Sequence, residues 1–379
     1  MSLPLVNPRP VEPSRYASID ALRGLAIVGV VAAHSRHLFI GLPSLADALA
    51  KLGSCGVQLF FVLSAFTLMN SRAARHDGAA RFYVRRLFRI APMFWLATAV
   101  YFGLDRLLGT PFWLGGAVDA RSVLLTLLFS HGWSADRINA IVPGGWSIAV
   151  EMNFYLLFPL LALGARSLGR AVAMLGAALL VAIAANAAAT ALVPPGPRVD
   201  DFIYYWLPNS LPAFMVGVVA FHLRDRAARR WPAAILLVVL AAGLAAVVAR
   251  GLLPWASSLA QPVGRGSAVA VAGLLLILAL YRLPTDAALS RLLANGAMVR
   301  LGQISFSVYL LHFLVIEALR RGVGLIRLPD GAADLLWLAS VPVLIGLTAL
   351  PALLAERWIE QPGIRAGGWL LRRAGRAPA

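Results

Sequence analysis

Long apolar runs separated by short polar loops dominate this chain. Ten of the runs are long enough to cross the hydrocarbon core of a bilayer as helices. They lie at about residues 16–40, 53–74, 82–108, 145–164, 169–192, 204–224, 231–250, 265–282, 302–321 and 333–358. The pattern predicts an all-α, polytopic membrane protein. We expect residues 1–15 to precede the membrane domain, which spans 16–360, and residues 361–379 to form a basic tail.

Composition agrees with a membrane location. Of the 379 residues, 60% are hydrophobic and only 13% are charged, whereas soluble domains carry about 25% charged residues. The formal net charge is +17, and every basic residue except Lys51 is arginine. These arginines fall in short loops between apolar runs, as in membrane proteins whose orientation is set by loop charge. We therefore expect the lipid bilayer, and no nucleic acid, as a partner.

The arginines alternate between the two sides of the predicted membrane. With the N-terminus on the cytoplasmic side, the arginine-rich loops fall together on that side and the sparser, acid-balanced loops fall on the other. The exception is the group Arg320, Arg321 and Arg327 after the ninth run. Both termini are then expected in the cytoplasm, and the first span is expected to serve as an uncleaved signal-anchor.

The first predicted span contains charged residues that a lipid-facing helix would not carry. Asp20 and Arg23 are one turn apart and can pair. Arg23 and His34 are eleven residues apart, so they project from one helix face, roughly 16 Å apart along the axis. Histidine is a natural general base for a hydroxyl group. A purely structural Asp–Arg pair, with the histidine at an interface, explains the same spacing.

The third predicted span begins with clustered arginines. Arg86 and Arg89 share a helix face, and Arg85 is adjacent to them. Guanidinium groups on one face match the oxygens of a phosphate or pyrophosphate. The alternative is ordinary orientation charge.

Two further spans carry polar residues in regular spacing. The fourth contains Trp146, Glu151 and Tyr155, and we expect Glu151 at about the depth of His34. In the ninth, Ser305, Tyr309 and His312 form one polar stripe, which usually faces a bundle interior. Packing roles for these groups remain open, and Ser64 of the second span is interpreted as a packing serine. The segment 109–144 is predicted to be an outer loop with a short interfacial helix at Arg121–Phe129.

Several catalytic signatures are absent from the sequence. The chain has no phosphate-binding Gly-x-x-x-x-Gly-Lys loop, no His-Glu-x-x-His pair and only one cysteine, Cys55. ATP-driven transport and zinc hydrolysis therefore lack support, and no metal is expected.

Taken together, these motifs resemble the membrane acyltransferase-3 family. The resemblance rests on Ile19-Asp20-x-Leu-Arg23-Gly24 with His34, Leu59-Phe-Phe-Val-Leu-Ser64, Arg86-x-x-Arg89, Trp146-Ser147-x-x-x-Glu151-x-x-Phe154-Tyr155, Leu301-Gly302-x-Ile-Ser305-x-Ser307-x-Tyr309-Leu-x-His312 and Glu360-x-Pro362. It covers residues 16–365. Ala65 stands where a glycine is common, and Met152 and Asn153 replace a frequent acidic pair.

The resemblance implies a ten-helix enzyme that moves an acyl group, usually acetyl from cytoplasmic acetyl-CoA, to a hydroxyl of a carbohydrate or glycan-linked acceptor. A stand-alone member in a bacterial inner or plasma membrane is expected, without a fused esterase-like domain. The candidate residues are His34, Arg23 and Glu151 for catalysis, Arg85, Arg86 and Arg89 for acyl-CoA, and Asp20, Tyr155, His312 and Trp146 for the acceptor. A transporter or flippase of a glycan-linked lipid, or a non-catalytic membrane scaffold, remains as an alternative.

Overall fold

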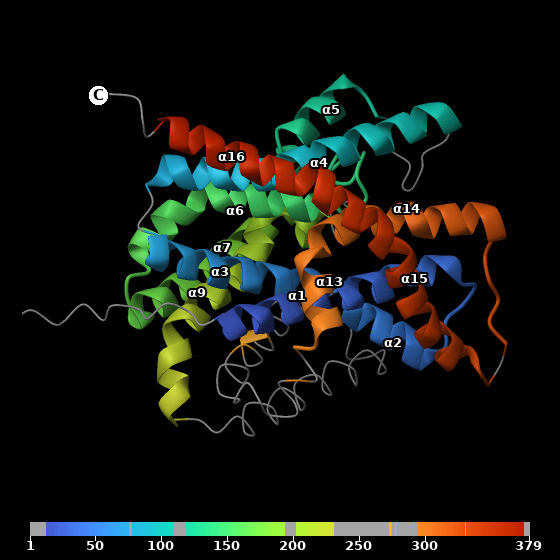
Figure 1. The fold of residues 1–379 in the computed structure, drawn as a ribbon, viewed down its shortest axis with the longest axis horizontal. Coiled ribbons are helices and arrows are strands. Elements are labelled where there is room, and N and C mark those ends of the chain that lie inside the picture. Colours follow the sequence, from blue (N-terminus) through green and yellow to red (C-terminus); the bar gives the residue numbers. More distant parts are fainter. Residues whose placement is uncertain are drawn as a thin grey trace, which may run out of the picture.

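The computed structural model describes residues 13–75, 78–109, 118–193, 202–230, 294–329 and 331–374, together with residues 273, 274, 277 and 291. This part of the chain is helical, and its only β contact is an isolated bridge between Phe39 and Ile326 (Figure 1). The elements are α1 (Pro13–Ser35), η1 (Arg36–Leu38), α2 (Ser44–Gly53), α3 (Gly56–Arg75), α4 (Ala79–Leu108), α5 (Ala120–Leu127), η2 (His131–Trp133), α6 (Gly145–Gly164), α7 (Leu168–Leu192), α9 (Leu207–Arg230), α13 (Gly296–Gln303), α14 (Ser305–Val323), α15 (Ala333–Ala355), η4 (Glu356–Glu360) and α16 (Gln361–Ala374).

The membrane-spanning character is confirmed for most of the predicted runs. Within the described residues, seven helical stretches are long and apolar enough to cross a bilayer, and the pair α13–α14 makes an eighth if it is one bent span. The predicted spans 231–250 and 265–282 lie almost entirely outside the described residues. The chain is thus a multi-pass membrane protein, while the total of ten spans and the orientation of the termini stay predictions.

Helix α1 lies at the centre of the bundle and packs against α2, α3, α13, α14 and α15. Glycines allow the closest approaches. A Cβ at Gly302 of α13 would lie 1.7 Å from the Asp20 carbonyl oxygen, and one at Gly24 would lie 2.3 Å from the Met298 carbonyl oxygen. Two helix backbones can approach this closely only where no side chain separates them. This contact fixes α13 beside the Asp20–Arg23 turn of α1.

The α3–α9 contact explains how the chain accommodates Ala65. The Ala65 side chain is fully buried, and the glycine of this contact lies on the partner helix instead. A Cβ at Gly217 of α9 would lie 2.2 Å from the Val62 carbonyl oxygen and 3.0 Å from the Ala65 Cβ. The two helices therefore keep a close contact, because the glycine that lets them approach lies on α9, opposite Ala65 of α3.

The predicted ninth span is a broken helix in the structure. Helices α13 and α14 meet at Ile304 with a bend of 81°. Helix α14 therefore begins at Ser305, inside the bundle, and its N-terminal end faces the interior (Figure 1). The positive end of a helix dipole is favourable for a nearby negative group.

The last predicted span continues further than its apolar pattern indicated. Residues Ala333–Ala374 form one helical stretch of 42 residues, which corresponds to about 63 Å of helix. Five of these residues, Glu356–Glu360, form a π-helical turn. Part of the segment expected as a basic tail is thus the helix α16, which packs along α4 (Figure 1).

The segment before α6 is ordered by polar contacts. Helix α5 occupies most of the predicted interfacial helix, and Asp119 caps it by accepting hydrogen bonds from the Ser122 backbone N–H (2.7 Å) and hydroxyl (2.8 Å). These bonds, with Arg137 nearby, lower the pKa of the Asp119 carboxyl group to about 2. Asn153 connects the segment to α6, because its Nδ2 donates to the Phe129 carbonyl oxygen (2.9 Å) and its Oδ1 accepts from Trp133 Nε1 (3.1 Å).

The only cysteine of the chain, Cys55, lies between α2 and α3. Its side chain is buried, with 9% exposure, and its sulfur lies 4.0 Å from the Lys51 carbonyl oxygen.

Candidate active site

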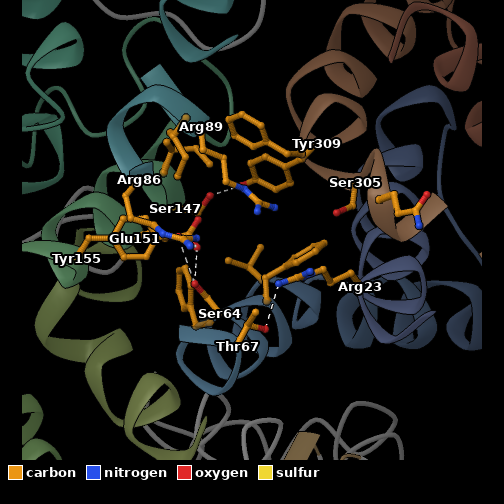
Figure 2. Close-up of a pocket in the computed structure, with 17 residues that line it drawn as sticks. Arg23, Ser64, Thr67, Arg86, Arg89, Ser147, Glu151, Tyr155, Ser305 and Tyr309 are labelled. Carbon is orange, nitrogen blue, oxygen red and sulfur yellow. Dashed lines mark hydrogen bonds between the residues drawn. The ribbon is translucent and has the colours of Figure 1, made fainter. Parts of the chain in front are cut away.

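A pocket that opens to solvent lies between the helices of the bundle. Its polar side chains come from six helices, α1, α3, α4, α6, α13 and α14, and those labelled in Figure 2 converge on one space. The lining residues are Arg23, Val57, Phe60, Phe61, Ser64, Thr67, Arg86, Arg89, Ile90, Ser147, Ile148, Glu151, Tyr155, Gln303, Ser305, Phe306 and Tyr309. Three of them are arginines and one is a carboxylate. The lining therefore carries an excess of positive charge.

Arg23 enters the cavity from α1, on the side opposite Arg86 and Arg89 (Figure 2). Its Nη1 donates to Asp20 Oδ1 at 3.1 Å, and its Nη2 donates to Thr67 Oγ1 at 3.2 Å. The predicted Asp20–Arg23 pair is therefore present. Because Asp20 itself is not part of the lining, it holds Arg23 in place and does not face the cavity. A guanidinium has five N–H donors, so donors remain for a bound group.

Arg86 and Arg89 enter from the first half of α4. Within the described residues, no carboxylate lies within ion-pair distance of either guanidinium, and the Nε of Arg86 is buried with no hydrogen-bond partner there. The Arg86 guanidinium carbon lies 5.9 Å from the ring centroids of both Phe82 and Tyr155, which restricts its position. Ionised donors that are held in place without a protein counter-ion are available to an anion.

Glu151 is the only carboxylate of the lining, and neighbouring hydroxyls orient it. Its Oε1 accepts from Ser64 Oγ at 2.6 Å and from Tyr155 OH at 2.5 Å. Its Oε2 accepts no hydrogen bond from a residue that the structure describes. Both bonds on Oε1 are charge-assisted and hold the carboxylate in one orientation, which leaves the other oxygen for a ligand.

A hydrogen-bonded layer closes one side of the cavity. Ser147 Oγ donates to Tyr309 OH at 2.8 Å, and Tyr309 OH donates to the Gly144 carbonyl oxygen at 2.9 Å. Gly144 has a φ of +73°, and a Cβ there would lie 2.8 Å from the Tyr309 hydroxyl. Glycine thus meets both the backbone geometry and the space at this position.

His131 packs against the start of α6, the helix that carries Ser147 and Glu151. The His131 ring is buried, stacks on Phe94 with centroids 5.9 Å apart, and lies 3.1 Å from the Gly145 carbonyl oxygen. Burial lowers the pKa of His131, so this imidazole is neutral. It acts as a structural support for the site.

His34 lies outside the cavity lining, in a cluster of rings with Phe313, His312 and His37. Its ring centroid is 4.4 Å from Phe313, 5.3 Å from His312 and 6.1 Å from His37. Of the two residues that were expected to project from one helix face, only Arg23 lines the cavity. His312 lies between the two regions, because its ring is 5.8 Å from that of Tyr309.

One hydrogen bond to the backbone defines the tautomer of His312. Its Nδ1 lies 3.2 Å from the Val308 carbonyl oxygen. A carbonyl oxygen only accepts, so Nδ1 carries the proton and Nε2 has a free lone pair. This Nε2 is buried and, within the described part of the chain, has no hydrogen-bond partner. It can accept a hydrogen bond from His34 or from a ligand.

Of the remaining candidate residues from the sequence, one lines the cavity and two do not. Tyr155 lines the cavity, whereas Trp146 does not: it packs against Tyr205 (4.6 Å between centroids), Tyr204 and Phe61. Arg85 lines a neighbouring cleft instead of the cavity.

Sequence reasoning missed Ser64, Thr67, Ser147 and Gln303 as lining residues. The i, i+3 spacing of Ser64 and Thr67 and the i, i+4 spacing of Ser147 and Glu151 were the available signals.

The comparisons with known proteins agree with a membrane-embedded transferase. A family model described as an acyltransferase domain (Acyl_transf_3) matches residues 16–357. Acyltransferase MdmB from Streptomyces mycarofaciens is 30% identical over 336 residues, which are 82% of this chain and 81% of that protein. Exopolysaccharide production protein ExoZ from Rhizobium meliloti (strain 1021) is 31% identical over 109 residues, 28% of this chain and 33% of that protein. No solved structure matches significantly. On the family match and the near full-length similarity to MdmB, this chain belongs to the acyltransferase-3 family and is a membrane acyltransferase.

Proposed function

We propose that the protein transfers an acyl group, with acetyl as the leading candidate, from cytoplasmic acyl-CoA to a hydroxyl of a carbohydrate or glycan-linked acceptor. The observation that carries this proposal is the cavity, in which Arg23, Arg86 and Arg89 face one oriented carboxylate. The similarity to ExoZ, an exopolysaccharide production protein, supports a glycan as the acceptor.

The arginines of α4 suit the donor. Arg86 and Arg89 have no carboxylate partner among the described residues, so a bound phosphate would supply the missing counter-charge. The arginine-rich loops are expected on the cytoplasmic side, where acyl-CoA is made. Donor phosphates near the start of α4 would leave the acyl-pantetheine arm to extend into the cavity, along its apolar residues Val57, Phe60 and Ile90.

Arg23 is suited to polarise the thioester carbonyl. Two of its donors are already bonded to Asp20 and Thr67, which hold the group without further reorganisation. A preorganised cation at the carbonyl oxygen stabilises the negative charge that develops in the transition state. The N-terminal end of α14 at Ser305 adds a favourable dipole on the same side of the cavity.

His34 is proposed as the base for the acceptor. The acceptor hydroxyl oxygen attacks the carbonyl carbon while His34 takes its proton. The C–S bond then breaks, and the CoA thiolate takes up that proton. The structure has no hydrogen bond between His312 Nε2 and the His34 ring, whose centroid lies 5.3 Å from that of His312, so an orienting bond between them would form only when the acceptor binds.

The position of His34 implies that the substrates meet at the Tyr309 layer. The donor carbonyl approaches this layer from the cavity, and the acceptor approaches it from the histidine cluster, where His37 is exposed. The Oε2 of Glu151 accepts no hydrogen bond from a described residue. On the cavity side it would accept one from an N–H or O–H group of the acyl-CoA or of the acceptor substrate.

The proposal is tested with the purified protein in lipid nanodiscs, acetyl-CoA and a panel of simple glycosides, by following the release of free CoA thiol. Arg86→Gln removes charged hydrogen bonds to phosphate, which are worth about 2 kcal/mol, so we expect the KM for acetyl-CoA to rise about 30-fold. The matched control is Arg106→Gln at the other end of α4, whose guanidinium lies over Phe102. We expect the control to leave KM unchanged.

His34→Gln should lower kcat by about 10²- to 10⁴-fold, the usual contribution of a general base, while acetyl-CoA still binds. Wild-type turnover in His34→Gln would remove the base assignment. An unchanged KM in Arg86→Gln would remove the donor assignment.

A further inference from the structure

A second cleft adjoins the central cavity, and five of its eight lining residues are arginines. It lies between the first half of α4 and the helix α16. Its lining consists of Arg81, Arg85, Arg86, Arg89, Ile364, Gly368, Leu371 and Arg372. No carboxylate is part of this lining. Five guanidiniums that face one space repel each other, so the cleft favours a multiply charged anion.

The cleft and the cavity share two residues. Arg86 and Arg89 belong to both linings, so they stand where the two spaces meet. A ligand whose reactive end lies in the cavity and whose charged end passes Arg86 and Arg89 would therefore extend into the cleft. The far residues of the cleft, Arg81 on α4 and Arg372 on α16, would then contact the part of the ligand most distant from the reaction.

Helix α16 forms a fixed wall of this cleft. Pro92 of α4 has no N–H to donate, so the carbonyl oxygen of Phe88, four residues earlier, lacks its helical donor. Gly363 of α16 packs against this notch, because a Cβ there would lie 2.7 Å from the Phe88 carbonyl oxygen and 2.9 Å from the Pro92 ring. Gly367, one turn later, packs against the Phe88 side chain, with a would-be Cβ at 2.8 Å. These two contacts fix how α16 is rotated about its axis. They therefore also fix the direction in which Arg372 leaves the helix.

Helix α16 lies outside the family match, which ends at residue 357. Its contribution to a site is therefore not covered by that match. In the cleft, Ile364 and Leu371 supply apolar surface beside the arginines. Arginine side chains both bind phosphate and stack on planar rings. A nucleotide that carries several phosphates fits this combination of charge, apolar surface and planar cations.

We infer that the cleft between α4 and α16 binds the 3′-phosphorylated adenosine diphosphate part of the acyl-CoA donor, with Arg372 and Arg81 as contacts for the 3′-phosphate. The inference rests on the proposed function, in which acyl-CoA is the donor. It assigns the pyrophosphate to Arg86 and Arg89 and gives Arg372 a role in recognising the nucleotide. Phosphate is also present in anionic lipid headgroups, so the experiment includes a lipid arm.

The test compares the affinities of acetyl-CoA and acetyl-dephospho-CoA, which lacks only the 3′-phosphate, for the full-length protein in detergent, by isothermal titration calorimetry. Wild type should prefer acetyl-CoA by about tenfold or more, as expected for loss of a charged contact. Arg372→Ala should bind acetyl-CoA about tenfold more weakly and acetyl-dephospho-CoA as the wild type does. In turnover, its KM for acetyl-CoA should rise with kcat unchanged.

The matched control is Arg373→Ala, one residue along the same helix. Its guanidinium carbon lies 4.8 Å from the Trp369 ring centroid, and it is not part of the cleft lining. It should keep the wild-type preference for acetyl-CoA.

Each other outcome overturns the inference in a distinguishable way. If Arg372→Ala keeps the full preference while Arg86→Gln weakens both ligands, the cleft assignment is wrong and the donor site stands. If neither variant weakens acetyl-CoA, the proposed function loses its donor site as well. If Arg372→Ala loses only affinity for short-chain phosphatidic acid, measured in the same detergent, the cleft is a lipid headgroup site.

Discussion

The closest approach at any glycine that the structure describes, at Gly302, makes a specific prediction about the active site. In Gly302→Ala the new Cβ would lie 1.7 Å from the Asp20 carbonyl oxygen and 2.5 Å from its carbon. An ordinary contact needs about 3.4 Å. Helix α13 must therefore move away from α1 by about 1.7 Å.

The size of the expected stability loss in Gly302→Ala follows from the kind of atoms that clash. Overpacking in a well-packed interior costs about 1–3 kcal/mol, and a clash with main-chain atoms belongs at the upper end, because no side chain can rotate away. We expect a loss of about 3 kcal/mol of stability and a Tm lower by about 5 °C. Gln303 and Ser305 would move with α13, and misplacement of about 1 Å can cost 10²-fold in rate. The value of kcat/KM should fall about 10²-fold.

The assay is thermal unfolding of the purified protein in detergent, together with CoA release from acetyl-CoA. The control is Gly296→Ala on the same helix, where a Cβ meets nothing within 4 Å, and it should match the wild type in both measurements. If Gly302→Ala also keeps the wild-type Tm and kcat/KM, α13 is not fixed against α1, and the reasoning about this side of the cavity is wrong.

Three further predictions concern the polar contacts around the site. Because the pKa of Asp119 falls from 3.8 to about 2 in the folded protein, its stabilisation of α5 is complete above its unfolded value and is lost as the pH falls through that interval. Hydrogen exchange of the α5 amides should accelerate there in the wild type and not in Asp119→Asn. Tyr155→Phe removes a charge-assisted hydrogen bond to Glu151 and should cost about 2 kcal/mol in chemical denaturation. Asn153→Ala releases the segment 129–133 from α6 and should increase its cleavage in limited proteolysis.

The sequence predicted those features of the site that depend on neighbours along one helix. The Asp20–Arg23 pair joins residues three positions apart, and helical spacing alone indicates it. The apolar runs likewise predicted α4, α6 and α7 closely, because their length and hydropathy reflect the bilayer directly.

Features that depend on packing between helices could not be predicted in this way. Helical spacing indicates the face on which His34 lies but not whether it lines the cavity. The bend at Ile304 has no proline to signal it, and it lies two residues after the close contact between Gly302 and α1. The role of α16 depends on a notch at Pro92, more than 270 residues earlier in the chain.

The burial of Cys55 makes this chain convenient for chemical labelling. Its thiol is the only one in the chain and is screened from solvent, so maleimide reagents should leave the wild type almost unmodified. Cysteines introduced at exposed loop positions such as Gly78 and Leu325 would then react alone. Membrane-impermeant reagents applied to intact cells would show which of these loops faces outward.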